Sequence, residues 1–252
     1  MPLSVPTRMG ELSPQKFNLK MEIDSKFVWG MSQKSDGQMI IYLEDRDNAK
    51  TNREKFFAGL GLDFRRMITA GLAHGHNITV VGEKECGQKI LNTDGLISSD
   101  PNIILTVTGA DCQPLYFFDE KNKVIGMAHA GWRGVEQNIA GKMVEKLKTE
   151  FGSKPEDIKV KIGPHIRKCH FEIGEDVAVQ FADYQNFITR EGVSIKLDLS
   201  AVVADQLKKV GVTAINIDIS EECTYCLKDK YYSFRRDHPE RVEAMVAYVV
   251  MK

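Results

Sequence analysis

Two histidines and a cysteine, each surrounded by small residues, are the side chains of this sequence best suited to bind a metal ion. His74 lies in LAHGHNITVV, Cys112 in TGADCQP and His129 in HAGWRG. Each lies at the end of a predicted strand, where small neighbours allow a ligand to approach closely. Two imidazoles and one thiolate suit Zn²⁺ and leave a fourth coordination position for water or substrate, as in catalytic zinc sites. The long intervals between the three match no local zinc finger, so only the fold can bring them together.

Charged residues near these motifs supply further candidates. Arg133 follows the tryptophan of HAGWRG and is the candidate contact for phosphate or another anion. Arg53, on a predicted early helix, is a second candidate for substrate binding, with a solvated helix face as the alternative. Asp94 and Asp111 could each orient a ligand imidazole through its other ring nitrogen, although Asp111 could equally cap its own turn. Trp132 is interpreted as a packing residue.

A second group of thiols lies outside these motifs. Cys223 and Cys226 form a CTYC pair, which needs further ligands before it can hold structural zinc. Cys169 and His170 could complete such a site, but reduced thiols in a packed corner are the favoured interpretation. An odd number of cysteines, five in 252 residues, is typical of a reduced protein and predicts a cytoplasmic location.

Composition and charge exclude several classes of partner. The 34 basic and 35 acidic side chains leave a net charge of −1, so no overall attraction to nucleic acid or to an acidic membrane surface is expected. Local arginines could still bind a small anion. No apolar stretch of about 18 residues predicts a membrane span, and the N-terminal MPLSVPTRMGELSPQKF is interpreted as unprocessed. Nothing in the composition indicates an oligomeric state.

The elements that must position these residues form one predicted domain, residues 1–252, because no repeat or linker interrupts the sequence. A stripe of apolar residues every four positions predicts a helix over 135–151 that Gly152 ends. The other predicted helices span 52–58 and 200–210. Strands are expected at 38–44, 77–82, 158–162, 215–219 and 244–250, with two or three more in 103–131 around a polar hairpin turn. Because helices and strands do not alternate strictly, the pattern favours an α+β fold with mixed sheets.

Taken together, these motifs resemble the YfiH-type or laccase-domain family, also described as multicopper polyphenol oxidases or as purine nucleoside phosphorylase-like. The matching pieces stand in the order of the family: HG at 74–75, DGLIS at 94–98, GADC at 109–112, HAGWRG at 129–134, IGPHIRKCHFEIG at 162–174 and CTYC with YYSFRRD at 223–237. The resemblance implies a four-layer α/β/β/α fold. It also implies a zinc site on His74, Cys112 and His129, the residues that the chemistry selects.

Three departures from the family pattern affect substrate preference more than metal binding. Leu-Ala-His-Gly stands where the family has Gln-Val-His-Gly, so a contact made by the glutamine is absent. His165 stands where a cysteine is usual, and Glu240 and Arg241 replace a Gly-Arg pair. None of the proposed metal ligands is changed.

The resemblance implies phosphorolysis of purine nucleosides: adenosine, inosine or methylthioadenosine reacts with phosphate to give the base and a ribose 1-phosphate. Deamination of adenosine is a second implied activity. A copper-dependent polyphenol oxidase is the alternative that the older family name carries, but a multicopper centre needs about ten histidines, and the chain has six. A hydrolase with Cys112 as nucleophile and His129 as base, and a factor that edits cell-wall peptidoglycan precursors, are further alternatives.

Overall fold

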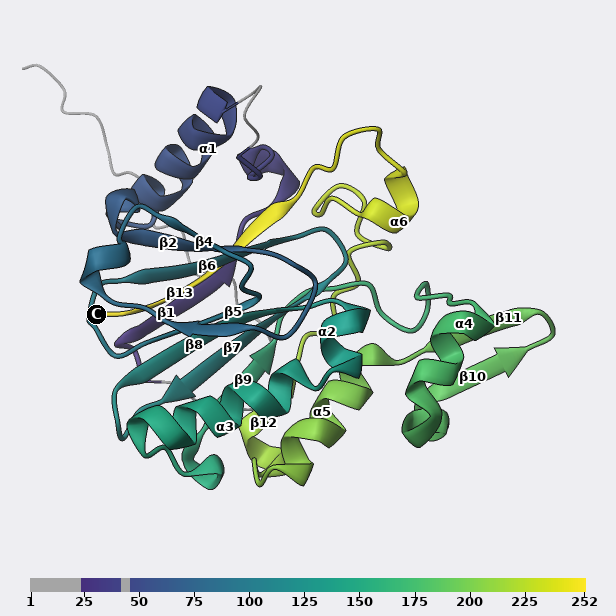
Figure 1. Cartoon of the computed structure of the whole chain (residues 1–252). Coiled ribbons are helices and arrows are strands. Elements are labelled where there is room, and N and C mark those ends of the chain that lie inside the picture. Colours follow the sequence, from purple (N-terminus) through teal and green to yellow (C-terminus); the bar gives the residue numbers. More distant parts are fainter. Residues whose placement is uncertain (1–23, 42–45) are drawn as a thin grey trace, which may run out of the picture.

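Two sheets packed face to face form the centre of the chain in this computed structural model, which describes residues 24–41 and 46–252 (Figure 1). The five-stranded sheet has the order β1 (Phe27–Met31), β13 (Met245–Met251), β6 (Ile104–Gly109), β2 (Met67–Gly71) and β4 (Lys89–Leu91). The six-stranded sheet has the order β12 (Ile217–Ile219), β9 (Lys159–Ile162), β7 (Gln113–Asp119), β8 (Val124–Ala130), β5 (Gly95–Ser98) and β3 (Ile78–Val80). Both sheets contain parallel and antiparallel pairs, as the sequence predicts.

Helices cover the outer face of each sheet. The helix α1 (Arg46–Gly59) packs Phe57 against Tyr248 and Ile104 of the five-stranded sheet. On the six-stranded sheet, α3 (Ile139–Phe151) and α5 (Leu199–Lys209) bury their apolar faces, and Figure 1 shows them side by side beneath it. The result is the predicted four-layer α/β/β/α arrangement.

Shorter elements complete the chain. A small lobe to one side of the sheets carries α4 (Glu175–Ala178) and a hairpin of β10 (Ile188–Glu191) and β11 (Ser194–Leu197) (Figure 1). The remaining α-helices are α2 (Trp132–Glu136) and α6 (Phe234–Asp237). Turns of 3-10 helix occupy Lys34–Asp36, Phe64–Arg66, Glu83–Glu85, Pro155–Asp157, Val179–Phe187 and Ala214–Asn216.

The alternation of side chains along β7 and β8 decides which residues point between the two sheets. Tyr116 and Phe118 of β7 lie in the core between the sheets, whereas Leu115 and Phe117 lie against the helices. Successive side chains of a strand point to opposite faces, so the even-numbered positions of β7 face the other sheet. Met127 faces the same way on β8, two residues before His129.

Several predicted elements differ from the observed ones. Residues 38–41 form no strand: the Gln38 side chain bonds both backbone polar groups of Ile40, and residues 42–44 lie outside the described residues. The predicted helix over 52–58 is part of the longer α1. The helix over 135–151 is two helices, because Asn138 adopts a left-handed conformation (φ 60°) and caps α3 through Gly141 N–H.

The predicted strand faces also need two corrections. Ile215, expected to point inward, is 78% exposed and precedes β12 in a 3-10 turn. Lys161, expected on the solvent side of β9, is buried: its ammonium bonds Asp218 and lies 4.6 Å from the centre of the Trp29 ring. A lysine with an acidic partner and an aromatic face can be buried without losing its interactions.

No helix in residues 24–41 and 46–252 is both long enough and apolar enough to cross a membrane.

Candidate metal centre

The fold brings His74, Cys112 and His129 together at the end of the space between the two sheets. We call these three residues the triad. Cys112 ends the turn between β6 and β7, His129 is the second-last residue of β8, and His74 lies in the loop after β2. One ligand atom of each lies within 4.8 Å of those of the other two. A single ion at bond lengths of about 2.0–2.3 Å can therefore reach all three after small side-chain rotations.

The strands explain this convergence. On β8, His129 points to the same side as Met127, towards the other sheet. Cys112 directly precedes β7, and both its Sγ and His129 Cε1 border the same position beside Gly131. His74 arrives from that other sheet, and its ring meets the His129 ring edge to face with centroids 4.9 Å apart. The predicted strand-end positions of the triad thus correspond to one corner of the fold.

Asp94, at the start of β5, holds the two histidines in place. Its carboxylate accepts hydrogen bonds from the backbone N–H groups of Ala73, His74 and Gly75 at 2.9–3.2 Å. Its Oδ1 also lies 3.2 Å from His129 Nδ1. This contact turns His129 Nε2 away from Asp94 and leaves it for a metal ion, as carboxylate–histidine pairs do in zinc sites. Of the two aspartates expected to orient an imidazole, Asp94 therefore does so.

The backbone of His74 supports this assignment. Its φ of 56° is in the left-handed region, which is rare for a residue with a side chain. Asp94 stabilises the conformation through its bond to His74 N–H. Such conformations persist where the surrounding structure holds them and occur often at functional sites.

Gly131 leaves open space beside all three side chains of the triad. A Cβ on Gly131 would lie 3.2 Å from Cys112 Sγ, 3.5 Å from His129 Cε1 and 3.7 Å from His74 Cδ2. Every ligand side chain therefore borders this position.

The two imidazoles have different electrostatic surroundings. Burial disfavours a charged His129, but the attraction of Cys112 and Asp94 outweighs it and raises the pKa of His129 to about 9. Burial and the nearby charges of His129 and Arg133 lower the pKa of His74. Burial would raise the pKa of Asp94, but its bonds to His129 and to the loop keep that pKa below its usual value. A metal ion that binds His129 would therefore compete with a proton for the ring.

Arg133 lies at the exposed side of this corner. Its guanidinium stacks on the Trp132 ring at 4.3 Å and, among the described residues, forms no ion pair. Its positive charge helps to lower the pKa of His74. Trp132 packs against the core below α2, as expected, and also serves as the platform for Arg133.

Arg53 occupies a different environment from the one predicted. It is 2% exposed, not solvated, and donates to Met39 O at 2.7 Å and to Thr69 Oγ1 at 3.0 Å. Burial lowers its pKa to about 10. These contacts tie α1 to β2 and favour a structural role over contact with a substrate.

Asp111 neither orients an imidazole nor caps its own turn. Its Oδ1 accepts a hydrogen bond from Thr224 at 2.6 Å, and its Oδ2 accepts bonds from Ser233 Oγ and from Arg235 N–H at 3.0 and 2.7 Å. The residue next to Cys112 thus anchors a segment more than a hundred residues away, which no local pattern indicates.

The structure also brings together the four residues of the second thiol group, which we call the cysteine cluster: Cys169, His170, Cys223 and Cys226. The sequence favours reduced thiols packed in the protein interior, but Cys169 and Cys226 are exposed and, of the three cysteines, only Cys223 is buried.

The chain is similar in sequence to known proteins over most of its length. The family model of multi-copper polyphenol oxidoreductase laccases matches residues 37–252. A purine nucleoside phosphorylase of Clostridium acetobutylicum is 34% identical over 170 residues, which are 66% of this chain and 70% of that protein. One of Deinococcus radiodurans is 33% identical over 206 residues, which are 78% of this chain and 77% of that protein.

The fold also matches solved structures. The crystal structure of YlmD from Geobacillus stearothermophilus superimposes with a TM-score of 0.86 at 27% identity, covering 90% of this chain and 93% of that one. The YfiH protein of Bacillus licheniformis gives a TM-score of 0.82 at 26% identity, with the same shares covered.

Proposed function

The chain belongs to the multi-copper polyphenol oxidoreductase laccase family, and we propose that it is a zinc-dependent purine nucleoside phosphorylase. Relatives that match 66%, 77% and 78% of this chain carry the name purine nucleoside phosphorylase. The proposed substrates are inorganic phosphate and a purine nucleoside such as adenosine, inosine or methylthioadenosine.

The observation that carries this proposal is the triad, a three-ligand set with one exposed side. His74 is exposed, Cys112 is partly exposed and His129 is buried, so a small molecule can approach from the His74 side. Nitrogen and thiolate donors in this number suit zinc and leave a position for substrate. Bound there, zinc would act as a Lewis acid that polarises an atom of the substrate.

Copper oxidase chemistry fits the chain less well. A multicopper centre binds several copper ions largely through imidazoles, whereas the whole chain has six histidines, two of them in the triad. His165 is buried and its Nδ1 donates a hydrogen bond to Gly163 O, and His170 lies in the cysteine cluster.

The residues of the chain contribute position and charge to phosphorolysis. In this reaction a phosphate oxygen bonds to C1′ of the ribose while the C1′–N9 bond breaks and its electrons leave with the base. Arg133, exposed beside the triad, supplies a guanidinium that can bind phosphate through two parallel hydrogen bonds. Asp94 keeps His129 and the His74 loop aligned during the reaction.

An assay of base release tests the proposal. The purified protein is incubated with adenosine, inosine or methylthioadenosine, with and without phosphate, and the products are separated by liquid chromatography. The proposal predicts free base and ribose 1-phosphate only when phosphate is present. Conversion of adenosine to inosine without phosphate would identify a deaminase, and phosphate-independent release of base would identify a hydrolase.

A thiol hydrolase is a second candidate, because Cys112 and His129 are close enough for their charges to interact. It predicts inactivation of metal-free protein by iodoacetamide and no loss of activity with a chelator. Activity that a chelator removes and zinc restores would exclude it.

A further inference from the structure

The four side chains of the cysteine cluster come from two loops that meet beside the sheets. Cys169 and His170 lie in the turn after β9, and Cys223 and Cys226 lie in the turn after β12. Cys169 Sγ is 3.7 Å from Cys223 Sγ and 3.8 Å from Cys226 Sγ. His170 Nδ1 is 3.2 Å from Cys169 Sγ and 3.3 Å from Cys226 Sγ.

These distances are close to the edges of a metal-centred tetrahedron. Four zinc bonds of about 2.3 Å to sulfur and 2.0 Å to nitrogen place sulfurs about 3.8 Å apart and sulfur and nitrogen about 3.5 Å apart. The two sulfur–sulfur distances agree with these values, and the two sulfur–nitrogen distances are slightly shorter. A disulfide would instead require about 2.0 Å between two sulfurs.

The surroundings hold the ligands in this arrangement. The His170 ring stacks on Tyr225, with ring centres 4.0 Å apart and planes 14° apart. Arg167 N–H donates to Cys223 Sγ at 3.4 Å, and Thr224 N–H donates to His165 O at 3.0 Å. Backbone donors to sulfur and fixed imidazole planes are the outer contacts that metal ligands commonly have.

Packing alone does not account for the cluster. Free cysteines are among the most buried residue types, yet Cys169 and Cys226 are both exposed. An ion would explain why two exposed thiols face each other and a histidine. We therefore propose that Cys169, His170, Cys223 and Cys226 form a second zinc site, separate from the triad and structural in role.

Four protein ligands close the coordination sphere, so this site has no position for substrate. Its effect is to link the loop after β9 to the segment 220–237, which we call the CTYC segment. This segment also binds Asp111 through Thr224 and Ser233. The proposed zinc thus stabilises the segment that anchors the residue next to Cys112.

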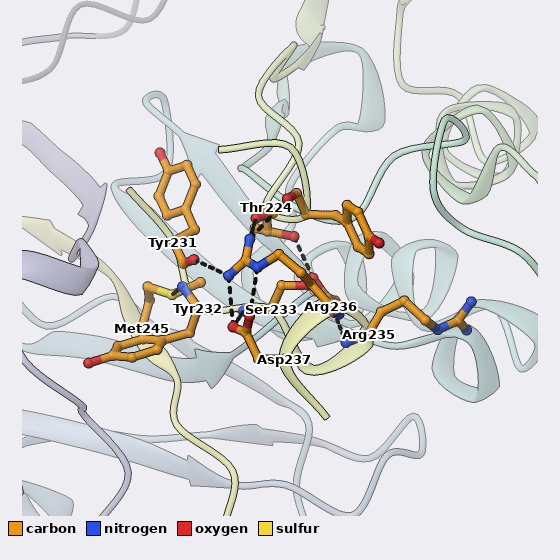
Figure 2. A network of polar contacts seen from close by, with 10 residues as sticks. Thr224, Tyr231, Tyr232, Ser233, Arg235, Arg236, Asp237 and Met245 are labelled. Carbon is orange, nitrogen blue, oxygen red and sulfur yellow. Dashed lines mark hydrogen bonds and ion pairs between the residues drawn. The ribbon is translucent and has the colours of Figure 1, made fainter. Parts of the chain in front are cut away.

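A network of polar contacts extends this link, as Figure 2 shows. The guanidinium of Arg236 donates to the carbonyls of Thr224, Tyr225 and Tyr231 at 2.8–2.9 Å. It also pairs with Asp237, whose carboxylate accepts from Ser233 N–H. These polar contacts add to the burial of Tyr231 and Tyr232 in holding the CTYC segment in place.

Zinc content of the full chain tests the proposal. Protein saturated with zinc and passed over a chelating resin is analysed by mass spectrometry of the metal, with about two equivalents expected per chain. Cys112→Ala should retain the cluster zinc and hold about one equivalent, as should the double variant Cys169→Ser with Cys226→Ser. Cys86→Ser, which removes a thiol outside both sites, should retain two.

Cobalt provides an independent readout that identifies the ligands. Three of the four expected sulfur–cobalt bonds belong to the cluster, so the double variant should lose most of the sulfur-to-cobalt charge-transfer absorption and Cys112→Ala about a quarter. A single zinc that the double variant loses and Cys112→Ala retains would count against the triad site alone, whereas a double variant that holds as much zinc as the wild-type protein would overturn the proposal. So would a mass showing that Cys169 is joined to Cys223 or Cys226 by a disulfide in protein purified with zinc present.

Discussion

The triad and the cysteine cluster use the same ligand types on different frameworks. The triad offers three candidate ligands at or next to the ends of strands from both sheets and is open on the His74 side. The cluster offers four candidate ligands on two loops, three of them sulfur. Three ligands on a rigid frame are suited to chemistry, and four ligands on loops are suited to holding loops together.

Two aspartates extend this difference. Asp94 bonds the His74 loop and His129, so it acts on the ligands of the triad. Asp111 is next to Cys112 but bonds Thr224, Ser233 and Arg235 of the CTYC segment. One carboxylate therefore supports the site itself, and the other connects it to the second region.

Loss of a triad ligand should have the largest effect on activity. His74→Ala, Cys112→Ala and His129→Ala should each lower kcat/KM for phosphorolysis about a thousandfold or more, since the Lewis acid is lost. Each should also lose the triad metal with little change in fold, which metal analysis and circular dichroism measure. Cys86→Ser is the matched thiol control, and a triad variant with full metal content would contradict the ligand assignment.

Substitutions of the two aspartates should affect the triad and the CTYC segment differently. Asp94→Asn removes the negative charge behind His129 and should weaken zinc binding by the triad about a hundredfold. Asp111→Asn should change that affinity little and should instead lower the free energy of unfolding, since it weakens three hydrogen bonds. Competition with a chromogenic chelator measures the zinc affinities. Equal losses of zinc affinity in Asp94→Asn and Asp111→Asn would show that the two aspartates do not have separate roles.

Arg133 should affect phosphate more than nucleoside. Arg133→Ala should raise the KM for phosphate about thirtyfold, because a charge-assisted bidentate contact is lost. Arg133→Lys should restore part of this affinity. Initial rates at varied phosphate measure both, with Arg190→Ala as the control, since Arg190 is an exposed arginine paired with Glu175. An unchanged KM for phosphate would exclude Arg133 as the contact.

Acid should lower the free energy of unfolding through His165, whose backbone oxygen accepts a hydrogen bond from Thr224 of the CTYC segment. Burial lowers the pKa of His165 to about 4, below that of an unfolded histidine. Because the unfolded chain binds this proton first, stability is lost as pH falls from about 6.5 towards 4, with about 2 kcal/mol lost near pH 5.

His165→Asn keeps a donor for Gly163 O but cannot be protonated, so it should remove this part of the pH dependence. Urea unfolding near pH 7 and near pH 5 measures the change for each protein. If the wild-type protein and His165→Asn lose the same free energy of unfolding between pH 7 and pH 5, groups other than His165 control the acid sensitivity.

Crowding of the triad should have the smallest effect. Gly131→Ala places a methyl group 3.2 Å from Cys112 Sγ and should weaken zinc binding about tenfold. Gly59→Ala is the matched control, because nothing lies within 4 Å of its added Cβ. Unchanged zinc affinity in Gly131→Ala would show that the ion lies farther from this position than we infer.

Local patterns predicted the parts of this molecule that depend on nearby residues. The triad could be selected because Cys112 follows a predicted strand, His129 ends one, His74 precedes one, and each stands beside glycine, alanine or aspartate. The strand β13 and the end of α3 at Gly152 also follow from local pattern. These features need no knowledge of distant contacts.

Features that depend on distant contacts could not be predicted in this way. The role of Asp111 depends on residues 113 to 124 positions away. Arg53 has the sequence context of a solvated helix residue, and only the packing of α1 on β2 buries it. The four residues of the cysteine cluster were recognisable as ligand types, but their approach required the fold.

We propose that a metal ion bound by the triad makes phosphate-dependent cleavage of a purine nucleoside possible. The most direct test removes metal from the wild-type protein, adds zinc in steps with inosine and phosphate present, and measures hypoxanthine and ribose 1-phosphate. We predict that both products appear in equal amounts, that their rate rises with zinc, and that Cys112→Ala remains inactive at every zinc level. Full turnover in the metal-free protein, or none at saturating zinc, would contradict the account.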